Sequence, residues 1–279
     1  MKKILSILIL ASSIIYGQLE LPRLSPKAEV YQRIGYTDIS IEYSRPSVKG
    51  RKIWGGLVPY DKVWRTGANE STRIKFTTDV IINGQTVPAG IYSIFTIPSH
   101  NEWTVILNKK LGWGLDYDPE LDLMRFKVKP EKTDFTERLL FLIPEISDSV
   151  CTVEMRWENL KISFDITIKL NEEVYKRIKE ALAKAGSDDW QVYLVAARYA
   201  AENGVFLDEA GEWIEKALSI TKNFYTYLIK AKLLYRQGKF AEALDTLELC
   251  REAGRNNDDY PGYVYEVDLL EKRIREKLN

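Results

Sequence analysis

Histidine and cysteine are scarce in this chain of 279 residues. Because His100 is the single histidine, a metal site with two histidine ligands is excluded, and a Ser–His–acid triad would need His100 itself. No glycine-rich phosphate loop and no dinucleotide fingerprint occur. Cys151 and Cys250 form neither a disulfide framework nor a zinc-ligand spacing, so we expect two buried free thiols, with a disulfide as the alternative in an exported protein. We expect no metal and no cofactor.

Long apolar runs are also rare, and the one near the start predicts export. The run from Ile4 to Ile15 follows two lysines and precedes Gly17, a small residue at which a peptidase can cut. Twelve residues rise only about 18 Å as a helix, short of a hydrocarbon core of about 30 Å. We therefore predict a cleaved signal peptide over residues 1–17, a periplasmic or secreted protein, and no membrane span after cleavage. Cleavage would remove two of the 40 basic residues and none of the 40 acidic ones, leaving a net charge of −2, so no nucleic-acid partner is expected.

Residues 18–170 have the pattern of an antiparallel β domain. Residues 37–43 alternate apolar and polar side chains, and Asn83-Gly84 is typical of a tight turn between strands. Short strands at this spacing, with no helices between them, favour an all-β sandwich or barrel. The predicted strands are 37–43, 72–82, 90–98, 103–108, 122–128, 138–143, 150–157 and 161–169, and the predicted core residues are Ile39, Ile41, Ile94, Val105, Val153 and Ile166.

Residues 171–279 have a helical pattern, beginning with Asn171 as the expected cap. Later helices are predicted over 188–203, 208–220, 223–237, 240–253 and 261–278. Two pairs of these helices align with offsets of 34 or 33 residues, placing Ala197 over Ala231, Ala210 over Ala243 and Ala217 over Cys250. That period resembles the tetratricopeptide repeat. The Leu-Gly pair and the closing proline of that repeat are missing, and a generic helical bundle is the alternative.

The most unusual segment runs from Tyr43 to Glu70, between two predicted strands. It holds six Lys or Arg side chains against two carboxylates, with Trp54, Tyr60 and Trp64 among them. Long loops inside compact domains are often functional. Its motifs SRPSVKGRKIWGGLVPY (44–60) and VWRTGANE (63–70) resemble the DUF2911 family, a domain of unknown function, and the resemblance extends from about Ser25 to Ile168. The resemblance implies no activity, so the chemistry has to come from the residues.

The cations, aromatic rings and polar groups of this segment are the candidate ligand-binding residues. Arginine forks suit a carboxylate or phosphate, and an indole face suits a ring. Alternatives remain open: the tryptophans can be core anchors, Arg65 and Glu70 can pair to fix the loop, and Asn69 can cap the turn. A second aromatic loop, 112–122, is either an opposite wall or a surface connection. The candidates are Arg45, Arg51, Lys52, Trp54, Trp64, Arg65, Asn69 and Glu70.

Three hypotheses follow for the function. The first is an exported binding or scaffold protein of the cell envelope, with a small anionic, sugar or peptide ligand in the β domain and a protein partner on the helical domain. The second is a carboxylate-dependent hydrolase of an envelope glycan or ester, with Glu70 as a weak catalytic candidate. The third is a purely structural domain. The absence of a catalytic constellation favours the first.

Overall fold

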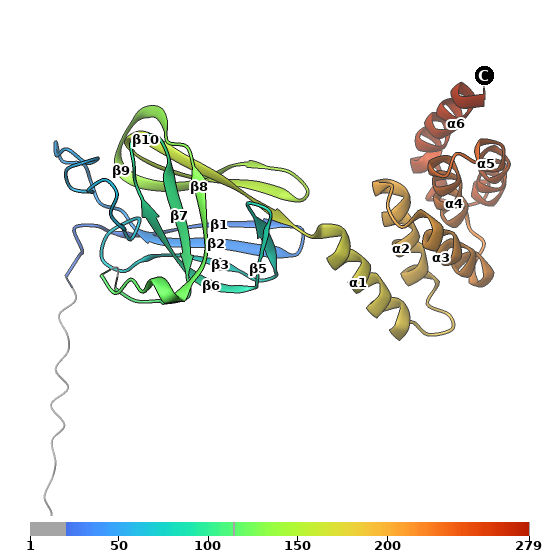
Figure 1. Ribbon diagram of the computed structural model, residues 1–279. Helices are drawn as coiled ribbons and strands as arrows, with labels where there is room; N and C mark the ends of the chain where they lie inside the picture. Colours follow the sequence, from blue (N-terminus) through green and yellow to red (C-terminus); the bar gives the residue numbers. More distant parts are fainter. Residues whose placement is uncertain (1–20, 114, 279) are drawn as a thin grey trace, which may run out of the picture. The chain divides into compact units, whose positions relative to one another are not determined.

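The computed structural model describes residues 21–113 and 115–278 (Figure 1). The chain divides into two compact units, and the division falls between Ile168 and Lys169. The predicted signal peptide, residues 1–17, lies outside the described residues. In the part of the chain that is described, no helix is both long and apolar enough to cross a membrane.

The part of the first unit that the structure describes forms two antiparallel sheets, which confirms the predicted all-β fold. The six-stranded sheet has the order β1-β2-β3-β6-β7-β8, and the four-stranded sheet has the order β5-β4-β10-β9. The strands of the first sheet are β1 (Lys27–Ile34), β2 (Thr37–Ser44), β3 (Thr72–Phe76), β6 (Gly90–Ile97), β7 (Trp103–Asn108) and β8 (Asp122–Val128). Those of the second are β4 (Val80–Ile82), β5 (Gln85–Val87), β9 (Glu131–Ile146) and β10 (Val150–Ile168).

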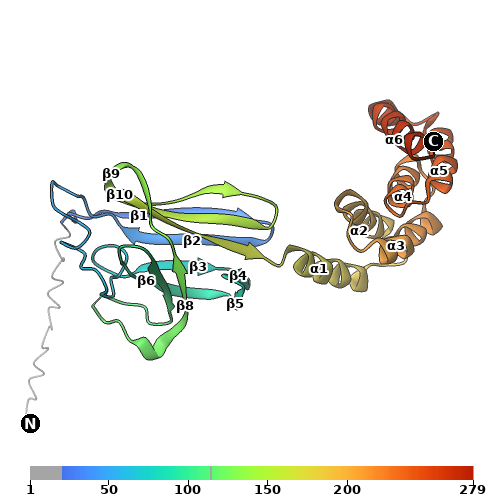
Figure 2. The same cartoon turned by 45° about the horizontal axis from the view of Figure 1, so that its top comes forward.

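Apolar side chains of the two sheets meet in a shared core. Tyr43 of β2 contacts Phe141 of β9, with ring centroids 4.9 Å apart, and Phe126 of β8 contacts Phe164 of β10 at 5.3 Å. Figures 1 and 2 show the long β9–β10 hairpin lying over β1 and β2. All six predicted core residues are at most 1% exposed, so the period-two alternation identified the inner faces correctly.

The prediction of a single strand over residues 72–82 is wrong. The chain turns at 77–79, so that β3 pairs with β2 and β6 while β4 pairs with β10 in the other sheet. The predicted Asn83-Gly84 turn does join β4 to β5, with φ of 49° and 76° at its two residues. The strands predicted over 150–157 and 161–169 are one continuous strand, β10, whose register shifts around Glu158. Glu158 has a φ of 54° at this irregularity.

The segment between β2 and β3 is attached to both sheets and forms the blue loops at one end of the unit in Figure 1. On one side, Val48 N donates to Glu137 O of β9 at 2.8 Å, and Leu139 N donates to Pro46 O at 3.0 Å. On the other side, Trp64 and Thr96 of β6 exchange two backbone hydrogen bonds of 2.7 and 2.8 Å. These bonds satisfy backbone groups that a free loop would leave to solvent, so the segment has a defined course despite lacking regular structure.

Within its described residues, 169–278, the second unit contains six α-helices, which confirms the predicted helical domain. They are α1 (Leu170–Lys184), α2 (Trp190–Asn203), α3 (Leu207–Ile220), α4 (Phe224–Arg236), α5 (Phe240–Gly254) and α6 (Val264–Leu278). Asn171 is not the cap of α1, because the helix begins one residue earlier, at Leu170, and Lys169 occupies the cap position. A capping box does start α4, where Asn223 and Thr226 exchange side-chain to backbone hydrogen bonds.

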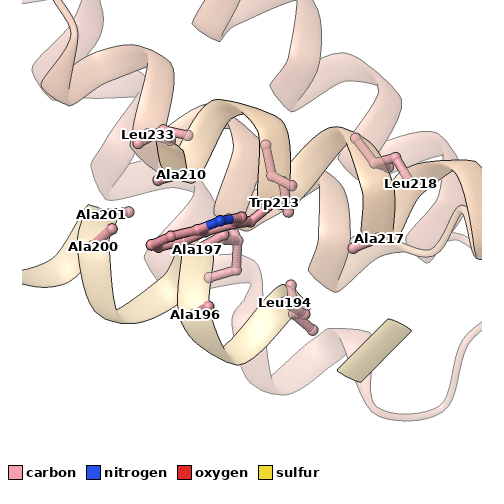
Figure 3. Close-up of a cluster of buried hydrophobic side chains, with 12 residues drawn as sticks. Leu194, Ala196, Ala197, Ala200, Ala201, Ala210, Trp213, Ala217, Leu218 and Leu233 are labelled. Atoms are coloured by element: carbon pink, nitrogen blue, oxygen red, sulfur yellow. The ribbon is translucent and has the colours of Figure 1, made fainter. Parts of the chain in front are cut away.

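Small residues set the packing of these helices. The six positions aligned by the offsets of 34 and 33 residues are all 0% exposed. In Figure 3, Trp213 of α3 reaches toward the alanines of α2, which lack the bulk to keep the two helices apart. The aligned residues are Ala197, Ala231, Ala210, Ala243, Ala217 and Cys250.

Both cysteines are free and buried. Cys151 lies on β10 in the first unit, and Cys250 lies on α5 in the second. Burial raises the pKa of both thiols to about 11. Cys250 Sγ also donates a hydrogen bond to Phe224 O at 3.1 Å. The prediction of two buried free thiols therefore agrees with the structure.

Candidate functional site

A pocket of about 350 Å³ lies in the β unit, beside the segment that joins β2 to β3. Three parts of the chain form its wall: the residues just before β1, the segment 46–68 and Trp157 of β10. The lining residues are Leu24, Ser25, Pro46, Ser47, Lys49, Arg51, Leu57, Val58, Trp64, Arg65, Gly67, Ala68 and Trp157.

The charge of this lining has a single sign. Lys49, Arg51 and Arg65 contribute cations, and no aspartate or glutamate is among the described lining residues. Arg51 is oriented by its own loop, because its Nε donates to Val48 O at 3.0 Å and its Nη2 donates to Ser47 O. Its remaining guanidinium donors are left for other acceptors. Three cations in a described lining that holds no carboxylate favour an anionic ligand.

Arg65 is the most informative of the three cations. It is half-buried, and its Nε atom is buried without a hydrogen-bond partner among the described residues. A buried donor that lacks an acceptor costs about 1–3 kcal/mol, and more when the group is charged. A ligand oxygen against the part of Arg65 that lines the pocket would offset the positive charge of the guanidinium.

Indole rings form the aromatic wall. Trp64 stacks on Trp157 with centroids 5.7 Å apart and planes inclined by 17°, and both line the pocket. Trp54 packs by its edge behind them, 5.8 Å from Trp64 and 4.7 Å from Trp103. Trp54 is only 6% exposed and does not line the pocket. The core-anchor interpretation therefore describes Trp54, while Trp64 presents its ring to the pocket.

The backbone of this segment is held in uncommon conformations. Lys49, Asp61, Thr66 and Asn69 all have φ between 48° and 60°. This region is unfavourable for a β-branched residue such as Thr66, and such conformations persist only where the surroundings enforce them. Thr66 is fixed from two sides: its hydroxyl donates to Thr96 Oγ1 at 3.1 Å, and its carbonyl accepts from the Thr72 hydroxyl at 2.7 Å.

Glu70 and Asn69 lie outside the pocket and hold one of its walls. Glu70 pairs with Arg23, whose Nη1 lies 2.7 and 2.8 Å from the two carboxylate oxygens. This hydrogen bond from Arg23 is the main cause that lowers the pKa of Glu70. Asn69 Nδ2 donates to Ser25 O and to Ser44 Oγ, both at 3.3 Å. Residues 21–26, which we call the arm, are thus fastened so that Leu24 and Ser25 line the pocket.

The arrangement corrects two alternatives drawn from the sequence. Glu70 pairs with Arg23 and not with Arg65, and Asn69 connects separate segments instead of capping its own turn. The described residues of the loop 112–122, all but 114, are not among the residues that line the pocket. The loop contacts Glu70 through a backbone bridge to Trp113, whose side chain is 59% exposed.

The remaining candidates lie away from the pocket lining. Arg45 is half-buried, and its Nε donates to Leu139 O of β9 at 2.9 Å, which makes it a link between the sheets. Lys52 is exposed, and its carbonyl accepts a hydrogen bond from Leu57 N at 3.0 Å. Of the eight candidates, Arg51, Trp64 and Arg65 are brought together in the lining.

Sequence reasoning missed Trp157 and the arm. Trp157 reads as an ordinary residue of a long strand, and the backbone irregularity at Glu158 beside it leaves no motif in the sequence. The arm has no apolar pattern, and its role depends on the contact of Arg23 with a residue 47 positions later. Residue spacing alone gives no signal for either feature.

An antiparallel β unit with a cationic, indole-walled pocket, joined to a helical unit, defines the class of this protein. The chain belongs to the family described as "Protein of unknown function (DUF2911)", whose family model matches residues 25–166. Every lining residue except Leu24 falls within the matched range. No curated protein and no solved structure matches the chain.

Proposed function

We propose that this protein binds a small anionic ligand in the β unit and a protein partner through the helical unit, as a binding or scaffold protein of the cell envelope. The observation that carries the first part is the pocket lining, whose described residues include three cations and two stacked indoles but no carboxylate. Ligand pockets are concave and mostly apolar, with a few converging polar groups that fix orientation. The volume of about 350 Å³ suits a molecule the size of a substituted sugar ring.

The hydrolase alternative has less support from the geometry. Glu70 is not among the lining residues, and its carboxylate is occupied by Arg23. Because its pKa is lowered, Glu70 stays ionised at neutral pH and is a poor proton donor. A purely structural role for the segment is the competing explanation, and it is separable by experiment.

The test compares ligand responses of two double variants with equal loss of charge. Arg51→Ala with Arg65→Ala removes two pocket cations, whereas Lys75→Ala with Lys132→Ala removes two exposed cations that do not line the pocket. Thermal stability is measured with glucose, glucuronate, glucose 6-sulfate and glucose 6-phosphate. We expect the acids to stabilise the wild type and the control variant but not the pocket variant. An equal response in a folded pocket variant would move the site elsewhere, and no response to any acid would support the structural role.

The second part of the proposal concerns the helical unit. The first residues of α2 and α4 lie 34 positions apart in the sequence, and those of α3 and α5 lie 33 positions apart. This spacing supports a tetratricopeptide-like repeat of two helical hairpins. A groove of about 510 Å³ lies on α2, α4 and α6. Its lining residues are Ala201, Glu202, Lys232, Tyr235, Arg236, Glu266, Leu269, Leu270 and Arg273.

Site-directed crosslinking tests whether this groove contacts a protein. A photoreactive residue at position 269 lies in the groove, and one at the exposed position 248 on α5 lies outside it. We expect a discrete crosslinked product in cells from position 269 and none from position 248. Equal products from both positions, or none from either, would remove the groove from the proposal.

Export is the third part of the proposal and rests on residues 1–17. We infer a periplasmic or secreted location from the basic start, the apolar run and the small residue Gly17. Mass spectrometry of the protein purified from its native cells should find a chain that begins at Gln18. Recovery of the intact chain from the cytoplasm would contradict export.

A further inference from the structure

The charge of the pocket points beyond an anion in general, toward one with two negative charges. Lys49, Arg51 and Arg65 line the same small volume, and none of the three side chains has an ion-pair partner among the described residues. The carboxylate of Glu137 is exposed and is not among the lining residues, although it accepts a hydrogen bond from the Lys49 backbone at 3.0 Å. A monoanion would leave most of the positive charge uncompensated, whereas a dianion offsets most of it.

The shape of the donor set also favours a tetrahedral anion. Arg51 is fixed by Ser47 O and Val48 O, so its free donors have a set direction, and Arg65 has a half-buried guanidinium. Lys49 adds an ammonium group on a flexible stem. Three separate cations can each meet one oxygen of a phosphate group, whereas a carboxylate offers only two oxygens in one plane.

The other side of the pocket suits an uncharged ring or hydrocarbon. Trp64 lies on this side, stacked on Trp157, which is itself only 1% exposed, and Leu24 and Leu57 are 84% and 47% exposed beside it. Exposed leucines at a pocket edge are favourable contacts for the apolar face of a sugar or for an acyl chain. The ligand therefore combines a doubly charged head with a less polar body.

We propose that the pocket binds a phosphate monoester, with the dianion held by Lys49, Arg51 and Arg65 and the esterified group against Trp64. This inference rests on the proposed anion-binding function and narrows its ligand class. A soluble sugar phosphate and the monoester headgroup of a phospholipid share this chemistry.

The pH dependence of binding tests this inference, because a phosphate monoester gains its second charge in a pH range where few side chains of the protein change charge. The second ionisation of a phosphate monoester has a pKa near 6. The chain has a single histidine, His100, which packs against Tyr60 with ring centroids 4.0 Å apart and does not line the pocket. Glu70, with its lowered pKa, is already ionised across this range.

The experiment is isothermal titration of the full chain with glucose 6-phosphate, glucose 6-sulfate and glucuronate between pH 5 and 7.5. Sulfate esters are tetrahedral monoanions throughout this range, and glucuronate carries a planar carboxylate. We expect the phosphate ester to bind on the order of tenfold more tightly at pH 7.5 than at pH 5, because only the dianion matches the site. The sulfate ester should bind more weakly and without this pH dependence.

Each outcome has a separate meaning. Equal, pH-independent binding of all three acids would overturn the phosphate assignment while leaving anion binding intact. Failure of all three to bind would overturn both. Dihexanoyl phosphatidic acid is titrated in parallel, and tighter binding than glucose 6-phosphate identifies the lipid source, while the reverse identifies the sugar source.

A variant series checks that the binding comes from this pocket. Arg65→Ala should weaken the phosphate ester on the order of 10- to 100-fold, as expected for a lost charge-assisted hydrogen bond. Arg65→Lys should recover only part of that loss, because an ammonium lacks the planar fork. Lys75→Ala, an exposed change outside the lining, should bind as the wild type does. Unchanged affinity in a folded Arg65→Ala variant would overturn the assignment.

Discussion

The turn at Gly56 supports the pocket wall, and replacing this glycine tests how strictly the wall is built. A Cβ atom at position 56 would lie 2.4 Å from the Lys52 carbonyl oxygen, a backbone atom that cannot rotate away. The same carbonyl accepts a hydrogen bond from Leu57 N at 3.0 Å, and Val58 N donates to Ile53 O at 2.9 Å in the same turn. Gly56→Ala must therefore open the turn.

The expected cost of Gly56→Ala is about 3–4 kcal/mol. Two turn hydrogen bonds contribute about 1 kcal/mol each, and the displaced backbone adds about 1–2 kcal/mol of strain. Gly50→Ala is the matched control, because Gly50 lies in the same segment and its Cβ would meet nothing within 4 Å. Its φ of 67° leaves only the cost of a left-handed alanine, about 1–2 kcal/mol.

Hydrogen exchange measured by mass spectrometry locates the effect. Gly56→Ala should raise exchange across residues 45–70 far more than Gly50→Ala does, and urea unfolding followed by tryptophan fluorescence should give the matching difference in stability. Because Leu57 and Val58 line the pocket, glucose 6-phosphate should also bind more weakly to Gly56→Ala. Equal losses in the two variants would refute the claim that the turn is tightly built.

Three further predictions concern the arm, the helices and the thiols. Glu70→Gln should raise hydrogen exchange of the arm, residues 21–26, at neutral pH, because it removes the ion pair with Arg23. The pKa of Glu70 is lowered from its ordinary value of 4.5, so the ion pair stabilises the arm fully above pH 4.5. This stabilisation is lost as the pH falls through the lowered pKa, and the exchange rates of wild type and variant should then become equal. In the helical unit, Gly211→Ala should raise the free energy of unfolding by about 0.5–1 kcal/mol, because the new Cβ has no heavy atom within 4 Å. Gly254→Ala should lower it, because the new Cβ would lie 2.4 Å from the ring of Tyr260. Thermal melts followed by circular dichroism measure both changes. Both cysteine thiols, with pKa values of about 11, should resist iodoacetamide at pH 8 until urea unfolds the chain, and rapid labelling of the folded protein would contradict their burial.

Local pattern predicted the elements whose burial follows a simple period. The alternation around Ile39 and Ile41 identified β2, since one of its faces is buried and the other is partly exposed. The edge strand β1 does alternate in burial, but Gln32 interrupts the apolar series Ala28, Val30 and Ile34 on its more buried face, and the pairing with β2 completes the strand. The turn at 77–79, where the chain passes from one sheet to the other, was not predicted. The sequence indicates that residues 72–82 are extended, but it does not indicate that β3 joins β2 while β4 joins β10.

The candidate site was predictable where its chemistry is local. Arg51, Trp64 and Arg65 lie in one unusual segment, and the structure places all three in the pocket lining. The partners that complete the site come from distant positions: Trp157 stacks on Trp64, and Arg23 fastens the arm through Glu70. From the sequence, Arg65 was one possible partner of Glu70, because local spacing gives no information about a contact between residues 47 positions apart.

Nuclear magnetic resonance of the nitrogen-15 labelled protein tests the anion pocket most directly, since it reports individual side-chain N–H groups. During titration with glucose 6-phosphate at pH 7.5, the Nε–H signal of Arg65 and the indole signals of Trp64 and Trp157 should shift together along one saturating curve. The indoles of Trp190 and Trp213, in the helical unit, are internal controls and should stay in place. Unchanged signals from the three pocket residues, or shifts of equal size at all tryptophans, would contradict binding in this pocket.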